Sequence, residues 1–474
     1  MQMPRFDYNA DLDLDEDDGA SLFDRRPENV PLPPLPENSS PELPEGYPVP
    51  PPVPFAWNEE QRAAVERIVA WRFDSTMPRF MKLTGPAGTG KTLVTRELRR
   101  YFTGTRTAWT AMTGRASQRL RAAIGVKTKT YYSAVYHPPR EVDNVAEAKI
   151  DLAFEDIRYA SPDALLVVDE SSMVSPKLKA DADKSTYAKI LFIGDPIQIP
   201  PVLSKAEENE LGEDYSVFTS VDGPHLSRVM RNGGAVLSAA NYVREQRQIP
   251  AASSEEGGSR YDYVELGSPQ VVMRAAVDAW LEDREGHTLI TWKNDNRNVA
   301  NTVIRERLGL RGMLPEPGEP LVVRKNAHKF RLMNGDVVIC EEVTNEEVTL
   351  AGISMRWFRV RREDGKSIYL LAPVGDFSGT LPYVGLETWR RALREAEVDG
   401  NAVVPLTYGY CLTCHQAQGS QYRRVTTFLP GDMRSSNFNK MSRISDGTLM
   451  KFSMRWVYTA LSRAVKRTSL IVSR

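Results

Sequence analysis

The sequence has few cysteines and no long apolar run. Its 474 residues contain only Cys340, Cys411 and Cys414, which argues against a disulfide-stapled secreted protein. We recognise no secretory h-region and no stretch of the length that spans a bilayer. We therefore expect a reducing compartment, the cytoplasm of a bacterium or of an infected host cell. A chain of this length can bury two or three separate cores.

The formal net charge of −1 hides an uneven distribution of charge. Residues 1–54 carry about −9 and the remainder about +8. The surplus of basic side chains in the body indicates an anionic partner such as nucleic acid. Residues 1–54 are acidic and proline-rich, so we predict a disordered tail. A solvated spacer is the favoured interpretation of this tail. The alternative is a docking segment for a single-strand-binding or replisome protein.

A glycine-rich stretch matches the pattern G-x-x-x-x-G-K-[ST], and it reads Gly85-Pro86-Ala87-Gly88-Thr89-Gly90-Lys91-Thr92. A strand-like run precedes it and a helical pattern follows it. In this setting the backbone N–H groups of the loop surround a triphosphate, since glycines allow close approach. Lys91 supplies charge for the β- and γ-phosphates, and Thr92 supplies a hydroxyl for Mg²⁺. The stretch predicts an ATP site, which by itself does not specify a function.

Two further apolar runs end in polar residues. Residues 165–168 precede Asp169 and Glu170, and residues 190–193 precede a polar exit that contains Gln198. Both patterns are typical of buried parallel strands, whose carboxyl ends form ligand sites. We predict that Asp169 holds Mg²⁺, that Glu170 activates water, and that Gln198 contacts the γ-phosphate. The alternative is ordinary core strands with solvated ends.

Three other positions are ambiguous from the residues alone. Gln61, in an amphipathic helix upstream of the P-loop, is either an adenine-binding residue or a solvent-facing one. Thr130 and Tyr132 lie in a basic, aromatic stretch that suits single-stranded nucleic acid, and a structural tyrosine pair explains it equally well. Trp292 follows a strand-like run, where a role in core packing is as plausible as a binding role.

Taken in order, the motifs resemble those of superfamily 1 helicases, in the RecD-like branch that moves 5′ to 3′ and includes the Dda-type phage helicases. Each motif is weak alone, and the ordered series is specific. Besides the P-loop, the series comprises Thr113–Ala116, Asp169–Met173, Gly194–Gln198, Met230-Arg231, Thr413–Ser420 and Tyr458–Ala464.

The resemblance implies an α/β fold with two RecA-like P-loop NTPase domains and ATP between them. We expect the first domain over residues 55–220, with an inserted pin at about 137–162. We expect the second over 221–474, with an SH3-like β-barrel insertion at about 312–404. Strand-like runs at 321–323, 336–340, 348–350, 357–360 and 368–371, which alternate with turns, favour an antiparallel barrel in that insertion.

The resemblance also assigns roles to residues. It favours Gln61 and Gly419 as nucleotide contacts, and Arg231 and Arg463 as arginine fingers that stabilise the transferring phosphoryl group. The residues expected to contact DNA are Thr113, Gly114, Arg115, Thr130, Tyr132, Trp292, Asn294, His415, Gln418 and Ser420.

We therefore expect an ATP- and Mg²⁺-dependent DNA helicase that acts on single-stranded and fork DNA in DNA replication, recombination or repair, for instance of a phage. The resemblance further implies that it acts as a monomer. The alternatives are a translocase that displaces proteins with little unwinding, an RNA helicase, and a tail-mediated interaction protein with an ATPase switch.

Overall fold

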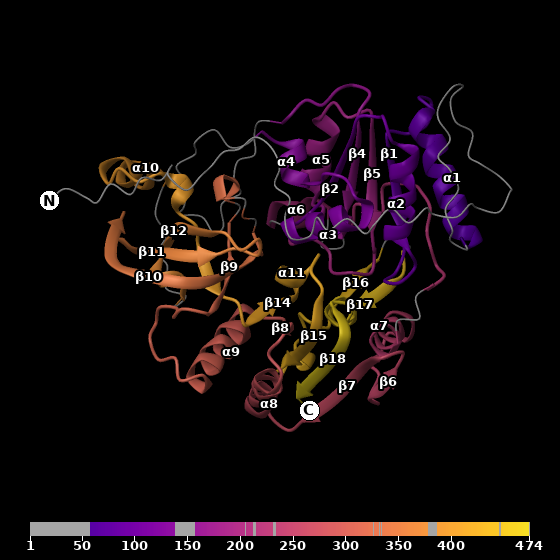
Figure 1. Ribbon diagram of the computed structural model, residues 1–474. Helices are drawn as coiled ribbons and strands as arrows, with labels where there is room; N and C mark the ends of the chain where they lie inside the picture. The colour runs from indigo at the N-terminus through magenta and orange to yellow at the C-terminus, as the bar shows by residue number, and fades with distance from the viewer. Residues whose placement is uncertain are drawn as a thin grey trace.

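The computed structural model describes residues 57–473 except 138–156, 204, 212–214, 231–233, 326, 331, 333, 378–385 and 445–446. The predicted tail and most of the predicted pin therefore lie outside the described residues. The described chain forms three main sheets, two of them flanked by helices (Figure 1). Within the described part of the chain, no helix has both the length and the apolar character that crossing a membrane requires.

The first sheet is entirely parallel, in the order β1-β5-β4-β2-β3. Its strands are β1 (Phe80–Thr84), β2 (Thr107–Ala111), β3 (Lys129–Thr130), β4 (Leu165–Asp169) and β5 (Lys189–Gly194). Its helices are α1 (Glu59–Phe73), α2 (Lys91–Tyr101), α3 (Gly114–Ile124), α4 (Tyr131–Val135), α5 (Pro176–Lys184) and α6 (Lys205–Leu211).

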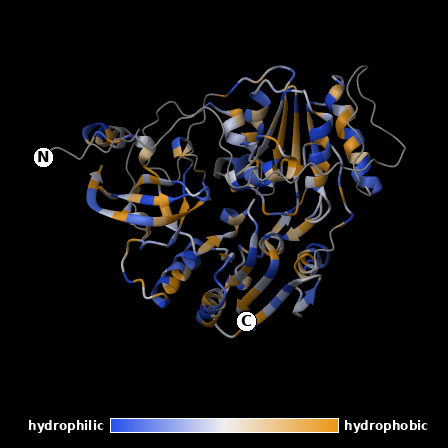
Figure 2. Cartoon of the chain, viewed as in Figure 1, coloured by the Kyte–Doolittle hydropathy of each residue, from blue (hydrophilic) through white to orange (hydrophobic). Residues whose placement is uncertain are grey.

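Both faces of this sheet are buried, which explains the continuous apolar runs of its central strands. Leu165 and Val167 of β4 pack in one core with α1, α2 and α3. Leu166 and Val168 point to the opposite face and pack with α4 and α5. Figure 2 shows these strands as a hydrophobic layer between helices of mixed character. The carboxyl ends of the strands are thereby left free to build a site.

The second sheet has the order β14-β8-β15-β18-β7-β6, and only β6 runs antiparallel. Its strands are β6 (Ser254–Glu256), β7 (Ser259–Leu266), β8 (His287–Thr291), β14 (Cys411–Thr413), β15 (Tyr422–Leu429) and β18 (Ala464–Ser473). Helices α7 (Gly234–Gln246) and α12 (Phe452–Leu461) share one core, and α8 (Pro269–Glu282) and α9 (Asn294–Arg307) share another. A short helix, α11 (Cys414–Ala417), follows β14, and a hairpin of β16 (Met441–Arg443) and β17 (Leu449–Lys451) precedes α12.

The third sheet is antiparallel, in the order β12-β11-β10-β9-β13. It contains β9 (Pro320–Val323), β10 (Val337–Leu350), β11 (Ile353–Arg361), β12 (Ser367–Pro373) and β13 (Leu406–Tyr408). Helix α10 (Leu386–Glu395) contributes Trp389 and Leu393 to a small core with Leu350 and Met355. The expected antiparallel insertion is thus present as a sheet, and its assignment as SH3-like stays a prediction.

Two details of this third sheet differ from the sequence-based expectation. Residues 336–340 and 348–350 are not separate strands, because β10 runs through both as one strand of 14 residues. The polar residues 341–347 between the two predicted runs belong to the strand, and shifts of register occur there between Cys340 and Glu342 and between Val343 and Glu347. In addition, β13 pairs with β9 from outside the predicted boundary at residue 404.

Candidate nucleotide site between the two parallel sheets

The P-loop joins β1 to α2 at the carboxyl end of the first sheet. Gly88 and Gly90 have φ angles of 86° and 92°, a left-handed conformation that glycine adopts without steric cost. Lys91 Nζ donates to the carbonyl oxygens of Gly85 and Pro86, at 2.5 and 3.0 Å. Thr92 is exposed in the first turn of α2. The loop therefore combines backbone donors, a cation and an accessible hydroxyl, which are the groups that a metal-bound triphosphate requires.

Gln61 is almost fully buried beside the P-loop, so the solvent-facing alternative is wrong. Its Oε1 accepts a hydrogen bond from the Asn58 N–H at 3.3 Å, completing a capping box at the start of α1. Its Nε2 donates to the Thr89 carbonyl oxygen at 3.0 Å. Gln61 thus braces the P-loop against α1. Its binding of adenine stays a prediction, and would require these two bonds to be exchanged.

Asp169 and Glu170 lie at the carboxyl tip of β4. The Glu170 N–H donates to Asp169 Oδ1 at 2.9 Å, and Glu170 has a φ of 55°, in the left-handed region. A non-glycine residue pays for that conformation in strain, which is common at functional sites. Burial, together with the negative charge of Glu170, raises the pKa of Asp169 to about 6, while the positive charges of Lys91 and Arg119 oppose the rise.

These carboxylates fit a magnesium site of the kind that also uses phosphate oxygens. Mg²⁺ is usually held by one or two protein oxygens and completed by water and substrate. The Asp169 carboxylate and the Thr92 hydroxyl are oxygen donors of the required type. No cluster of three or more His, Cys, Asp or Glu side chains able to hold a metal occurs among the described residues.

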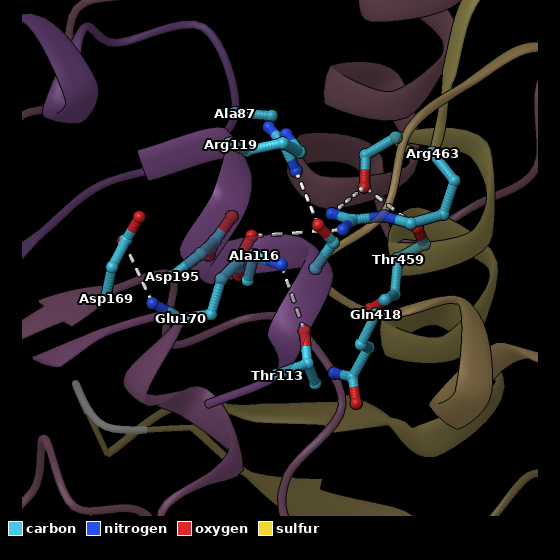
Figure 3. Close-up of polar contacts among 12 residues, drawn as sticks. Ala87, Thr113, Ala116, Arg119, Asp169, Glu170, Asp195, Gln418, Thr459 and Arg463 are labelled. Atoms are coloured by element: carbon cyan, nitrogen blue, oxygen red, sulfur yellow. Dashed lines mark hydrogen bonds and ion pairs between the residues drawn. The ribbon is translucent and has the colours of Figure 1, made fainter. Parts of the chain in front are cut away.

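Arg463 enters this site from the second sheet. It lies between α12 and β18, and its side chain is 5% exposed. Its Nη1 is 4.0 Å from Glu170 Oε1, and its Nε donates to the Thr459 carbonyl oxygen at 3.1 Å. Figure 3 shows Arg463 directed from the second sheet toward Glu170. The fold therefore brings the Arg463 guanidinium, beside the second sheet, close to the Glu170 carboxylate at the end of a strand of the first sheet.

The second predicted arginine finger, Arg231, lies outside the described residues. The preceding residue, Met230, is described, and its N–H donates to the Gly88 carbonyl oxygen at 3.0 Å. The chain that leads to Arg231 therefore passes directly beside the P-loop. Its role stays a prediction.

Gln198 is buried, and its Oε1 has no hydrogen-bond partner among the described residues. Its backbone is held by Arg455 of α12, whose Nη2 donates to the Gln198 carbonyl oxygen at 2.9 Å. Two further α12 side chains reach the same part of the first sheet: Tyr458 contacts Asp195 and Thr459 contacts Ile199. The sequence motif of α12 predicted a role for Arg463 but none for Tyr458 or Thr459.

Several residues predicted to contact DNA lie where the two parallel sheets meet. Thr113 caps α3 by accepting the Ala116 N–H at 3.2 Å, and Gly114 is the first residue of that helix. Arg115 Nη1 donates to the Tyr422 hydroxyl at 3.2 Å. A neighbour that the sequence did not single out, Arg119, donates to the Gly419 carbonyl oxygen at 2.9 Å. Helix α3, which follows β2, therefore contacts the residues that follow α11.

Gly419 has a φ of 74° and lies close to α3. A Cβ added there would lie 2.7 Å from Thr113 Oγ1 and 2.9 Å from Ala116 Cβ. Glycine is required both by the backbone and by this approach. Gly419 was predicted to contact nucleotide, and the structure gives it in addition a packing role between the sheets.

Three further candidates for DNA contact, Thr130, Tyr132 and Trp292, have structural partners. Thr130 is buried and caps α4, and the Tyr132 ring stacks on Tyr136 with centroids 6.1 Å apart. The Trp292 ring stacks on Phe438 at 4.4 Å. For Tyr132 and Trp292 the packing alternative is therefore confirmed as a role, since each is part of an aromatic cluster.

The last four differ in exposure. Asn294 is exposed at the start of α9, and His415 is half-buried, with burial lowering its pKa to about 4. Ser420 is buried, and Gln418 is buried with its Nε2 donating to the Ile199 carbonyl oxygen at 3.3 Å. Gln418 therefore bonds to the chain after β5, a contact that the sequence did not foresee. Binding of DNA by these four stays a prediction.

Comparison with known proteins agrees with the motifs. Residues 56–255 match a family model described as an AAA domain. The ATP-dependent RecD2 DNA helicase of Deinococcus radiodurans is 23% identical over 428 residues, covering 86% of this chain and 48% of the relative. The chain thus spans about half the length of that curated relative.

Solved structures of Pif1 helicases are also similar. Bacteroides Pif1 bound to single-stranded DNA is 17% identical, with a TM-score of 0.46, covering 87% of this chain and 91% of that one. Pif1 from Candida albicans is 16% identical, with a TM-score of 0.43, covering 88% and 94%. The family model and the RecD2 relative, together with the ordered motifs, confirm that this chain resembles the RecD-like superfamily 1 helicases.

Proposed function

We propose that this protein is an ATP-dependent DNA helicase that moves 5′ to 3′ along single-stranded DNA and separates duplex DNA. The observation that carries the proposal is the approach of Arg463 to Glu170. It brings a cation of the second parallel sheet to the acidic tip of the first, beside the P-loop. A site divided between two bodies is suited to converting hydrolysis into relative movement.

Binding of the triphosphate falls to the P-loop. Backbone N–H groups of the loop and the ammonium of Lys91 would face the dense negative charge of the phosphates, which a helix N-terminus also favours. Lys91 would exchange its bonds to the Gly85 and Pro86 carbonyl oxygens for phosphate oxygens. Mg²⁺, held by Thr92 and Asp169, would neutralise charge on the phosphates.

Hydrolysis requires a base and a stabiliser of developing charge. Glu170 lies at the strand tip, its carboxylate accepts no hydrogen bond from the described residues, and it is the proposed acceptor of the water proton. Arg463 is the proposed stabiliser of the phosphoryl oxygens. In the structure the two side chains face each other, so an anionic phosphoryl group between them would be met by both.

The DNA track is proposed along the loops where the two parallel sheets meet. Thr113, Gly114 and Arg115 come from the first sheet, and His415 and Ser420 from the second. Contacts from both sheets to one strand would let relative movement of the sheets advance the protein. The 5′-to-3′ direction, the pin at 137–162, the domain boundaries and monomeric action are proposed from the resemblance.

Hydrolysis of ATP in the presence and absence of single-stranded DNA tests this proposal. We expect stimulation by DNA and its loss in Lys91→Ala, which removes the P-loop cation. Lys127→Ala, at an exposed position between α3 and β3, serves as the matched control. Hydrolysis that DNA does not change would contradict the proposal, and stimulation by RNA instead of DNA would redirect it to an RNA helicase.

A further inference from the structure

The segment Asp195–Ile199 leaves the first sheet and packs against the second. Gly194 ends β5 of the first sheet. Only five residues later, Ile199 is fully buried in the core that contains α7 and α12, and Ile197 packs against the same core. Hydrophobic contacts therefore tie this segment to the second sheet, although it follows a strand of the first.

Hydrogen bonds from α12 hold the backbone of the segment. Arg455 donates to the carbonyl oxygens of Pro196, at 3.1 Å, and Gln198, at 2.9 Å. The Ile199 N–H donates to Thr459 Oγ1 at 3.1 Å. These are buried contacts, and a buried guanidinium that lost its carbonyl partners would be costly. The segment is therefore fixed to α12 by its backbone as well as by packing.

Tyr458 connects this arrangement to the P-loop. Its hydroxyl donates to Asp195 Oδ2 and accepts the Ala87 N–H, whose nitrogen is 2.9 Å away. Tyr458 is fully buried. Burial and the nearby Asp195 charge raise the pKa of its hydroxyl well above the ordinary value, so the hydroxyl stays protonated and its proton is directed to Asp195.

The geometry points to Tyr458 as a positioning residue that transmits the state of the P-loop to the second sheet through the Asp195–Ile199 segment. The inference rests on the proposed function. Backbone N–H groups of a P-loop, such as that of Ala87, donate hydrogen bonds to phosphate oxygens. A phosphate oxygen that accepts the Ala87 N–H would therefore compete with the Tyr458 hydroxyl for this donor. Any shift of Tyr458 is passed to α12, and from there to the segment that carries Gln198.

Tyr458→Phe tests this role because it removes only the hydroxyl. The measurement is the affinity for a fluorescent single-stranded DNA, with and without a saturating non-hydrolysable ATP analogue. The ratio of the two dissociation constants measures the coupling between the sites, which is typically about 5- to 150-fold in coupled proteins. We expect a ratio in this range for the full-length wild-type chain, and a ratio within about twofold of one for Tyr458→Phe.

Tyr261→Phe is the matched control. Tyr261 is also fully buried, and its hydroxyl donates to the Pro250 carbonyl oxygen at 2.8 Å, with no contact to the P-loop. Tyr261→Phe removes the same chemical group from the same hydrophobic core, so we expect it to keep the wild-type ratio. A wild-type ratio in Tyr458→Phe, or an equal loss in both variants, would overturn the inference.

Asp195→Asn provides a second test that does not alter Tyr458. Since Asp195 accepts the Tyr458 proton, we expect it to lower the ratio too. If the tyrosine acts through Asp195, the double variant loses no more than Tyr458→Phe alone. Additive losses would overturn that route. Failure of the wild-type chain to bind single-stranded DNA would instead count against the proposed function, so the two failures are distinguishable.

Discussion

Arg463 Nη1 and Glu170 Oε1 lie 4.0 Å apart, although Arg463 adjoins β18 of the second sheet and Glu170 directly follows β4 of the first. Both side chains are largely buried. The distance is that of an ion pair without a direct hydrogen bond, and Arg463 Nη1 has no hydrogen-bond partner in the part of the chain that the structure describes. Such a cation is available to an anionic group that enters between the two side chains.

Arg463→Ala should therefore impair hydrolysis far more than binding. We expect the turnover number for DNA-stimulated ATP hydrolysis to fall about 10³-fold or more, as for other arginine fingers. The affinity for ADP should change little, because the P-loop supplies that binding. Arg467→Ala is the control, since Arg467 pairs with Asp262 near the surface, at 2.9 Å. Turnover in Arg463→Ala within tenfold of wild type would count against its role.

Asp169→Asn should raise thermal stability at neutral pH when a chelator keeps metal away. Since the folded-state pKa of Asp169 is raised from 3.8 to about 6, the folded state binds its proton more tightly than the unfolded state. The contribution of the Asp169 carboxyl to the free energy of unfolding is therefore fully present below pH about 4 and is lost as the pH rises through about 6. Calorimetry at pH 7.5 and pH 4 should show a higher midpoint for the variant only at pH 7.5. Equal midpoints at pH 7.5 would refute the raised pKa.

Gln61→Ala separates bracing of the P-loop from recognition of adenine. The variant loses the hydrogen bonds to Thr89 and Asn58, so we expect weaker nucleotide binding in general. If Gln61 also binds adenine, the preference for ATP over GTP falls as well. Titration of both nucleotides measures the two effects, and equal losses for ATP and GTP would leave Gln61 as a brace only.

Gly419→Ala should be more harmful than an alanine at another left-handed glycine. The added Cβ would lie 2.9 Å from Ala116 Cβ, and the backbone φ is already 74°. At Gly365, φ is 81° but nothing lies within 4 Å of such a Cβ, so only the strain of about 1–2 kcal/mol is expected there. We expect Gly419→Ala to lower both the unfolding midpoint and the affinity for single-stranded DNA more than Gly365→Ala does. Equal effects would argue against close packing of the sheets at this point.

The sequence predicted the ATP site better than the surfaces around it. The P-loop and the Asp169-Glu170 pair were predictable because each local pattern follows from the chemistry of phosphate and metal binding. The tertiary partners of Tyr132 and Trp292 were not, since stacking on Tyr136 and Phe438 depends on packing that a local pattern does not contain. For the same reason, the local sequence left it open whether Gln61 faces solvent, since its burial depends on the P-loop that packs beside it.

The packing of the Asp195–Ile199 segment against the second sheet was also not predictable from the sequence. Its apolar residues Ile197 and Ile199 fit equally well in either core, and only the position of α12 decides between them. Likewise, the long strand β10 was divided in the prediction, because a polar stretch in a half-exposed strand resembles a turn.

Separation of tailed DNA duplexes tests the central claim most directly. A labelled duplex carrying a single-stranded tail at either the 5′ or the 3′ end is incubated with the full-length chain, ATP and Mg²⁺, and release of the labelled strand is followed in time. The account predicts ATP-dependent release from the 5′-tailed duplex, little from the 3′-tailed one, and none with Lys91→Ala. Preference for the 3′ tail would contradict the proposed direction. Hydrolysis of ATP without release from either duplex would contradict the helicase itself.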